Sequence, residues 1–92
     1  MGVHLMPGIS VCNLDNAGGG ILLPNIQQRF TYRGQPVAVV GTQVAPHGRH
    51  DRAVMIQGSA KMTIDGIPVV FAGCKASCDD EATGRLDMTV SG

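Results

Sequence analysis

FTYRGQPVAVVG, residues 30–41, is the stretch that decides the fold, because a second copy of it follows in the same chain. MTIDGIPVVFAG, residues 62–73, has the same pattern at a fixed offset of 32 residues. A period of this length is typical of chains that repeat one supersecondary unit. The two copies are identical at five positions: Thr31/Thr63, Gly34/Gly66, Pro36/Pro68, Val37/Val69 and Gly41/Gly73.

Each copy predicts a β-hairpin. Both halves are short and rich in Val, Ile and Thr, and they are bounded by glycine and proline, which is the signature of strands. The central glycines, Gly34 and Gly66, stand where a tight turn needs positive φ. No window has a sustained apolar period of 3.6 residues. We therefore expect an all-β fold with at most one helical turn near residues 79–83.

Parts of a third copy lie elsewhere in the sequence. MTVSG, residues 88–92, repeats the first half of the unit, and VHLMPG, residues 3–8, is interpreted as a degraded second half that ends on Gly8. We expect one domain over residues 1–92 with three hairpin units, of which the first and last are cut open.

The composition excludes several classes of protein. The 92 residues include two Phe, one Tyr and no Trp, so we expect a thin core that needs a metal or a partner as a further stabiliser. Seven Lys and Arg balance seven Asp and Glu, which argues against nucleic acid or an anionic membrane as a partner. There is no bilayer-length apolar run and no Sec-type leader, so we expect synthesis in the cytoplasm and any export to proceed without a Sec signal.

Three linking segments follow the unit-ending glycines, and they carry the residues that matter for chemistry. Counted from Gly8, Gly41 and Gly73, these segments are residues 9–23, 42–55 and 74–87. Equivalent loops of a repeated fold meet at one pole. That pole is expected to collect four side chains of the kinds that bind metals: Cys12, His47, His50 and Cys78.

Two thiolates and two imidazoles form a tetrahedral ligand set for zinc. Iron suits the same set, and the sequence does not separate the two metals. With all four positions filled by protein the site would be structural and would add folding free energy that the thin core lacks. A solvated polar loop with buried cysteines is the alternative explanation, and His4 and Cys74 remain alternatives to Cys12 as a ligand.

An enzyme is a further alternative. His47, His50 and Asp51 beside a thiol are the residue types of a nucleophile and base, or of an open metal site that activates water. Against this, the four predicted ligands leave no open position, and a chain of this size has little room for a deep pocket. We interpret the acidic run DDE, residues 79–81, as a solvated loop and expect no catalytic residues.

Together these features resemble the PAAR-repeat family, whose members form the sharpened tips of type VI secretion spikes and related phage tail spikes. The resemblance rests on hairpins of the form xVxxxGxPVxxxG, on QGS at residues 57–59, and on His and Cys residues after the unit-ending glycines, and it is clearest over residues 30–92. Ahead of the first hairpin, GGGILLPN (residues 18–25) stands where the family has Gly-Ser, and no aspartate follows the unit-ending glycines.

The resemblance implies a small cone of three β-hairpin units with pseudo-threefold symmetry and a zinc ion at the apex. The base would sit on the blunt end of a trimeric, VgrG-like β-helical spike protein, with one copy per trimer. The chain would then be a non-enzymatic, membrane-piercing tip, carried on a virion tail or secretion spike and in transient contact with the target cell envelope.

The spike partner is expected at the pole opposite the metal, where the hairpin turns and strand ends lie. The partner-binding residues expected there are Gly34, Gln35, Gly66, Ile67, Val90 and Gly92. The alternative function is that of a small metal-stabilised β-domain that binds another protein without piercing. The sequence does not distinguish a phage tail from a type VI secretion system.

Overall fold

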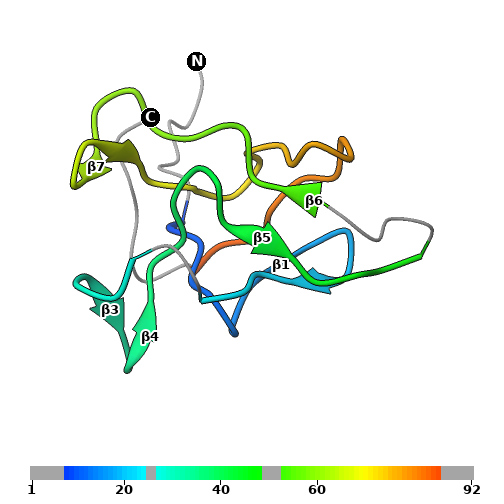
Figure 1. Ribbon diagram of the computed structural model, residues 1–92, viewed down its shortest axis with the longest axis horizontal. Coiled ribbons are helices and arrows are strands. Elements are labelled where there is room, and N and C mark those ends of the chain that lie inside the picture. The colour runs from blue at the N-terminus through cyan, green and yellow to red at the C-terminus, as the bar shows by residue number, and fades with distance from the viewer. Residues whose placement is uncertain (1–7, 25–26, 49–52, 86–92) are drawn as a thin grey trace, which may run out of the picture.

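The structure, a computed structural model, describes residues 8–24, 27–48 and 53–85. Within these ranges the chain forms short antiparallel hairpins and no helix, so none that could cross a membrane (Figure 1). Residues 79–83 contain no helical turn, and Glu81 instead pairs with Lys75 in an isolated β-bridge. The strands are β1 (Asn16–Ala17), β2 (Gly20–Ile21), β3 (Thr31–Tyr32), β4 (Gln35–Pro36), β5 (Gln43–Val44), β6 (Ala53–Val54), β7 (Thr63–Ile64) and β8 (Ile67–Pro68).

The two full repeats form the predicted hairpins, β3–β4 and β7–β8. In the first turn Arg33 and Gly34 have φ of 50° and 83°, and in the second Asp65 and Gly66 have φ of 55° and 80°. Positive φ at both central residues is the requirement of the two-residue turn whose twist matches that of the flanking strands. The repeat in the sequence is therefore a repeat of this turn.

Three extended segments, residues 9–11, 37–39 and 69–71, pair in a closed ring, which we call the central ring. Isolated bridges join Ile9 to Phe71, Val11 to Val37 and Val39 to Val69. At its centre Ser10 N–H donates to Val70 O (3.0 Å), Val70 N–H to Ala38 O (2.9 Å) and Ala38 N–H to Ser10 O (3.0 Å). Each segment thus pairs with both of the others.

A second set of hydrogen bonds corrects the alignment of the first unit. Ala72 N–H donates to Gly8 O (2.8 Å), just as Cys12 N–H donates to Pro36 O and Val40 N–H donates to Pro68 O (both 2.9 Å). Gly8 is therefore the equivalent of the two prolines that end β4 and β8. The interpretation of Gly8 as a unit-ending glycine is therefore wrong. The position equivalent to Gly41 and Gly73 lies five residues later, at Asn13.

Asn13 takes the place that glycine has in the other two units. Its φ is 67°, against 96° at Gly41 and 94° at Gly73. Asparagine tolerates this left-handed conformation better than most residues, so the turn persists without the glycine that marks it in the sequence. The first linking segment consequently starts after Asn13, and Cys12 lies at the end of a ring segment rather than in a loop.

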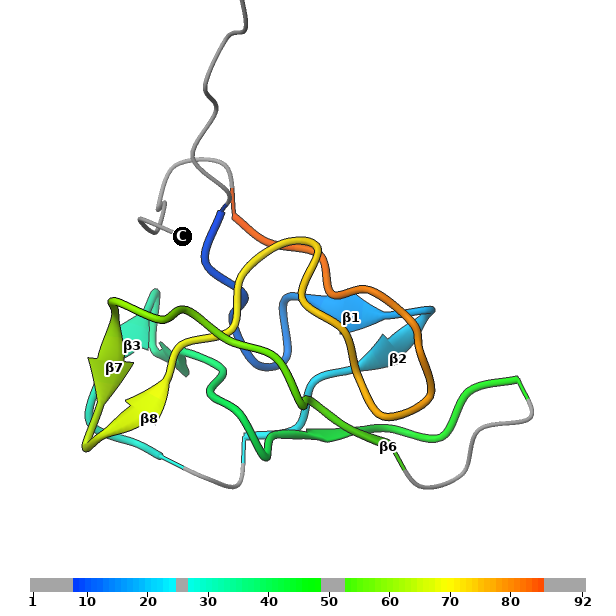
Figure 2. The same ribbon diagram turned by 90° about the horizontal axis from the view of Figure 1, so that it is seen from above.

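Successive side chains of the ring segments point to opposite sides of the ring, so they form two separate cores. Val37 and Val39 face the hairpins, while Ala38 faces the loops. We call the two ends the hairpin pole and the loop pole; β3, β7 and β8 lie at one end in Figure 2, and β1, β2 and β6 lie at the other. The hairpin-side core is Ile9, Val11, Val37, Val39, Ile64 and Val69. The loop-side core is Cys12, Ala17, Leu22, Ala38, Val44, Ala53, Met55, Val70, Cys74, Ala76 and Ala82.

The three loops at the loop pole are joined to one another in the same cyclic way. Isolated bridges connect them in pairs. The loop of β1–β2 therefore contacts the loop of β5–β6. The loop of β5–β6 contacts residues 74–82, and residues 74–82 in turn contact the loop of β1–β2. The bridges are Leu22–Val44, Met55–Ala76 and Ala17–Ala82.

A buried glutamine explains how the chain enters the first hairpin without a Gly-Ser pair ahead of it. Gln27 Nε2 donates to Phe30 O (2.9 Å) and Val37 O (2.8 Å), and its Oε1 accepts the N–H groups of Arg29 and Phe30 (both 2.9 Å).

Ser59 has the same position before the second hairpin. Its Oγ accepts the N–H groups of Lys61 (3.1 Å) and Met62 (2.9 Å), and its own N–H donates to Val69 O (2.8 Å). One glutamine side chain thus makes both the turn contacts and the strand contact that Ser59 makes.

Gln27→Ala should lower the free energy of unfolding by about 2–3 kcal/mol, because it leaves buried backbone groups without partners. Gln28→Ala is the matched control, since the exposed Gln28 side chain makes one bond, to Pro24 O, and its loss should cost less than about 0.5 kcal/mol. Denaturant unfolding of both variants measures the difference. Equal effects would contradict the role assigned to Gln27.

Candidate metal centre

Side chains from two loops converge at the loop pole. His47, Cys78 and Asp80 place one ligand atom each within 4.8 Å of the others. His47 Nε2 lies 2.8 Å from Asp80 Oδ2 and 3.9 Å from Cys78 Sγ, and that sulfur lies 3.4 Å from the same carboxylate oxygen. His47 comes from the loop between β5 and β6, and the other two come from residues 74–82. We call these three residues the ligand cluster.

The His47 ring is fixed by its other nitrogen. Nδ1 lies 2.9 Å from Ala45 O, a carbonyl that can only accept, so Nδ1 carries a hydrogen. Nε2 then faces the Asp80 carboxylate, and that contact is attractive only with a proton or a cation between the two atoms. A backbone carbonyl that orients an imidazole in this way is a common partner of metal-binding histidines.

The same contacts raise the pKa of His47 above 6.5, first through the hydrogen bond to Ala45 O and then through Asp80. Without metal, the protonated ring contributes stability that is fully present below the unfolded pKa and is lost as pH rises through the raised folded pKa. A metal ion must displace the Nε2 proton, so metal affinity should rise with pH over this range.

Glycines of the first loop make room for the cluster. A methyl group on Gly20 would overlap Nδ1 of His47, and one on Gly18 would overlap the carboxylate of Asp80. All three loops thus contribute to the site. Two provide ligand atoms, and the first loop leaves room for the side chains that carry them. This packing accounts for Gly18 and Gly20, while Gly19 between them has a φ of 98°, which favours glycine.

The donor set fits zinc. Imidazole nitrogen, thiolate sulfur and carboxylate oxygen are the usual zinc ligands, with bonds of about 2.0–2.3 Å. Tetrahedral ligands at those bond lengths lie roughly 3.2–3.8 Å apart, so the observed separations of 2.8–3.9 Å need only small shifts. His50, the predicted neighbour in the same loop, lies outside the described residues.

The predicted ligand Cys12 lies elsewhere. It belongs to the loop-side core, is 2% exposed, and its Sγ lies 3.5 Å from Leu23 O. Burial raises the pKa of this thiol to about 11, which favours the neutral form. Of the two alternative ligands, Cys74 is also in the loop-side core and outside the cluster, and His4 lies outside the described residues.

Asp80 is the residue that the sequence analysis missed, because residues 79–81 were interpreted as a solvated loop. The signal is its spacing from Cys78. The two residues flank Asp79, whose φ is 75°, and this turn brings the Asp80 carboxylate to 3.4 Å from Cys78 Sγ.

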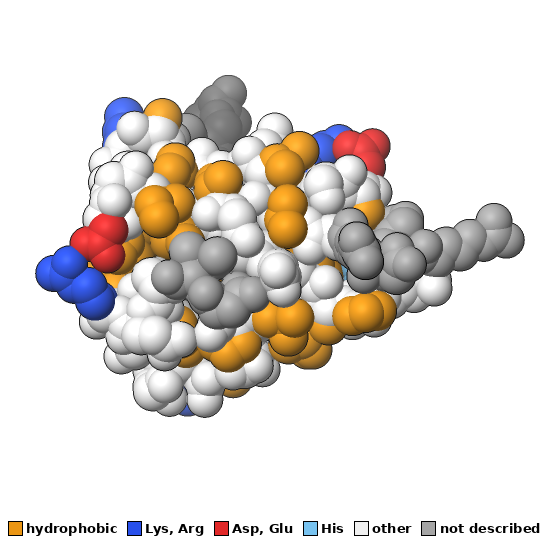
Figure 3. All heavy atoms as spheres, viewed as in Figure 1, with side chains coloured by type: hydrophobic (Ala, Val, Ile, Leu, Met, Phe, Trp, Pro, Cys, Tyr) orange, Lys and Arg blue, Asp and Glu red, His pale blue; other side chains and the backbone are white. Residues whose placement is uncertain are grey.

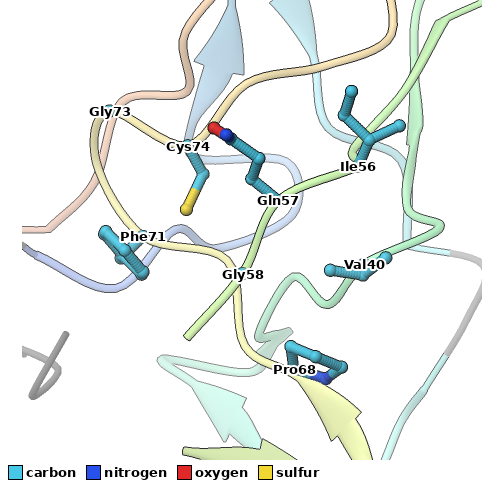
Figure 4. A pocket seen from close by; sticks show the side chains of 8 residues that line it. All are labelled: Val40, Ile56, Gln57, Gly58, Pro68, Phe71, Gly73 and Cys74. Atoms are coloured by element: carbon cyan, nitrogen blue, oxygen red, sulfur yellow. The ribbon is translucent and has the colours of Figure 1, made fainter. Parts of the chain in front are cut away.

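A pocket of about 510 Å³ lies apart from the ligand cluster (Figure 4). Its wall is mostly apolar, and the thiol of Cys74 is the only titratable group among its lining residues. Burial raises the pKa of that thiol and so disfavours the nucleophilic thiolate. The lining residues are Val40, Ile56, Gln57, Gly58, Pro68, Phe71, Gly73 and Cys74.

The residues expected to bind a partner lie at the hairpin pole where the structure describes them. Gly34 and Gly66 are exposed in the two turns, and Gln35 and Ile67 are half-buried beside them. Charged side chains are few and scattered on the face shown in Figure 3. Val90 and Gly92 lie outside the described residues.

A family model for the PAAR motif matches residues 15–83. The chain belongs to the PAAR-motif family. This is a structural family of spike tips, associated with type VI secretion and phage tails, and its members sit on spike proteins. The matched region contains both hairpins and the whole ligand cluster of this PAAR-motif protein. A search of curated proteins found no match.

Gly20→Ala should weaken zinc binding at least tenfold, because the added methyl group displaces the His47 ring. Gly19→Ala is the matched control. Its φ of 98° makes alanine strained, but the methyl group meets nothing within 4 Å, so it should cost about 1 kcal/mol of stability and leave zinc affinity unchanged. Chelator competition measures the affinities, and equal loss in both variants would rule out the proposed contact.

Proposed function

We propose that this protein is the non-enzymatic, membrane-piercing tip that caps a trimeric β-helical spike of a phage tail or type VI secretion system. The observation that carries the proposal is the central ring. Its three segments pair cyclically, which supports an arrangement of three similar units around one axis. A single copy can then match a threefold partner, which requires the same surface three times.

The hairpin pole has the features of the surface that meets the spike. Two β-hairpins end there in exposed turns, and Tyr32, Met62 and Ile67 pack against the hairpin-side core while partly exposed. Phe30 beside them is 44% exposed. Strand ends and apolar side chains suit a partner that is itself a stack of strands, because they continue its β-structure and cover its open edges.

The loop pole is the leading end in this proposal, and a zinc ion, or iron in its place, stabilises it. We infer that His47, Cys78 and Asp80 hold the ion, with His50 as the predicted fourth ligand. Cys12 then contributes packing rather than ligation. The ion would join the loop of β5–β6 to residues 74–82, where the core consists mainly of small side chains. The protein would pass through the target envelope with the spike.

Variants of the ligand cluster test the metal proposal. Cys78→Ser and Asp80→Asn should each lower zinc affinity by one to two orders of magnitude, because each removes a charged donor. Cys12→Ser should lower stability through its buried hydroxyl but leave one zinc per chain. Elemental analysis and chelator titration of the four proteins decide the question. Loss of zinc in Cys12→Ser but not in Asp80→Asn would restore the ligand set expected from the sequence.

Binding to a spike trimer tests the function. A purified β-helical spike trimer should bind one copy of this chain, as measured by sedimentation. Ile67→Asp, at the hairpin pole, should weaken that complex at least tenfold by burying a charge. Cys78→Ser, at the loop pole, should leave it intact. Binding of three copies, or of none, contradicts the tip proposal, and binding of only a different protein would favour the small metal-stabilised binding domain.

A further inference from the structure

The charged side chains of the described residues are widely spaced, but their signs differ between the two poles. Beside the hairpins they are three cations and one anion, a net charge of +2: Arg29, Arg33, Lys61 and Asp65. In residues 74–82 of the loop pole they are one cation and three anions, a net charge of −2: Lys75, Asp79, Asp80 and Glu81. Asp15 and Arg85 pair with each other (2.8 Å) and add no net charge. The described charges therefore sum to zero but are separated along the axis that joins the poles.

Two of the cations occupy equivalent positions in the two repeats. Arg29 and Lys61 are 32 residues apart, which is the offset of the repeat, and each stands two residues before a hairpin strand. The hydrogen bonds agree, because Gln27 Oε1 accepts Arg29 N–H (2.9 Å) and Ser59 Oγ accepts Lys61 N–H (3.1 Å). Both residues are exposed. The hairpin pole thus presents the same charge at two equivalent places.

The Arg29 side chain extends to the turn of the neighbouring hairpin. Its Nη1 donates to Oδ1 of Asp65 (2.5 Å), which lies in the turn of β7–β8, and the Arg29 side chain is still 78% exposed. An exposed ion pair of this kind contributes little stability. A guanidinium has five N–H donors, so the bond to Asp65 leaves others for a second carboxylate. Asp65 therefore orients Arg29 toward the end of the pole without using all of its donors.

An apolar side chain follows each of these two cations. Phe30 is 44% exposed, and Met62 is partly buried against the hairpin-side core. Apolar side chains with charges beside them match the apolar centre and polar rim of a protein–protein interface. Recognition of nucleic acid or of an anionic membrane uses denser clusters of cations than two separated residues. The pattern therefore favours a protein as the partner of this pole.

We propose that the hairpin pole recognises acidic side chains of its protein partner, which contact Arg29 and Lys61 around an apolar centre. This inference rests on the proposed function, in which the partner is the spike trimer. A threefold partner presents each of its acidic residues three times around the axis, so two equivalent cations of one chain can meet two copies of the same residue. The negative loop pole would be repelled by that surface, so charge would also orient the chain on the spike.

Charge reversal tests the inference. At about 50 mM NaCl, Arg29→Glu and Lys61→Glu should each lower the association rate constant with the purified spike trimer at least about fivefold, as measured by surface plasmon resonance. The effect should fall below about twofold at about 0.5 M NaCl, because salt screens exposed charges. Arg29→Gln and Lys61→Gln should act in the same direction by a smaller factor, and they keep the test decisive if a reversed variant fails to fold.

Lys75→Glu is the matched control for Arg29→Glu. It changes the net charge equally and also breaks one exposed ion pair, to Asp79 (3.5 Å), but it lies at the loop pole. It should change the association rate constant less than about twofold. Equal losses in Lys75→Glu and Arg29→Glu would overturn the inference, because they would show an effect of net charge alone.

The remaining outcomes separate this inference from the proposed function. Unchanged or faster association of the Arg29 and Lys61 variants, with one chain still bound per trimer, would overturn the inference and leave the proposed function intact. A wild-type chain that binds the trimer at neither salt concentration would contradict the proposed function and remove the inference with it. Binding to phosphatidylserine vesicles that is lost in these variants, with unchanged rates on the spike, would assign Arg29 and Lys61 to an anionic membrane instead.

Discussion

Three backbone hydrogen bonds, among Ser10, Ala38 and Val70, are the constraint on which the rest of the structure depends. They tie the three segments of the central ring to one another, so that no segment has a free edge within the ring. Because side chains alternate along each segment, the ring also sorts them into two cores. The hairpins and the loops therefore lie at opposite poles, each with its own core.

The two poles differ in how they are stabilised. The hairpin pole has branched side chains in its core, whereas five of the eleven loop-side core residues are alanines. Small side chains bury little apolar area each, so hydrophobic burial contributes less per residue in the loop-side core. Glycines in one loop leave space beside His47 and Asp80, which come from the other two. A metal in this space would cross-link the loop that carries His47 to the loop that carries Asp80, and so would stabilise the loop pole further.

The sequence was sufficient for the features that repeat. The turns at Gly34 and Gly66 and the all-β fold are confirmed, because these turns need positive φ, which glycine adopts at low cost. The sequence was not sufficient where a different residue type adopts the same conformation or makes the same hydrogen bonds. Asn13 adopts the conformation expected of glycine, and Gln27 makes the bonds of Ser59. The first replacement shifted the alignment of the first unit, which placed Cys12 in a loop rather than at the end of a ring segment.

X-ray absorption at the zinc edge of the purified protein is the sharpest test of the proposed metal site, because it would count the ligands of a zinc ion bound at the loop pole. The account predicts one sulfur at about 2.3 Å, with the other ligands being nitrogen and oxygen at about 2.0–2.2 Å. Two sulfur ligands would return Cys12 or Cys74 to the site. A protein purified with zinc present that binds no metal would contradict the account.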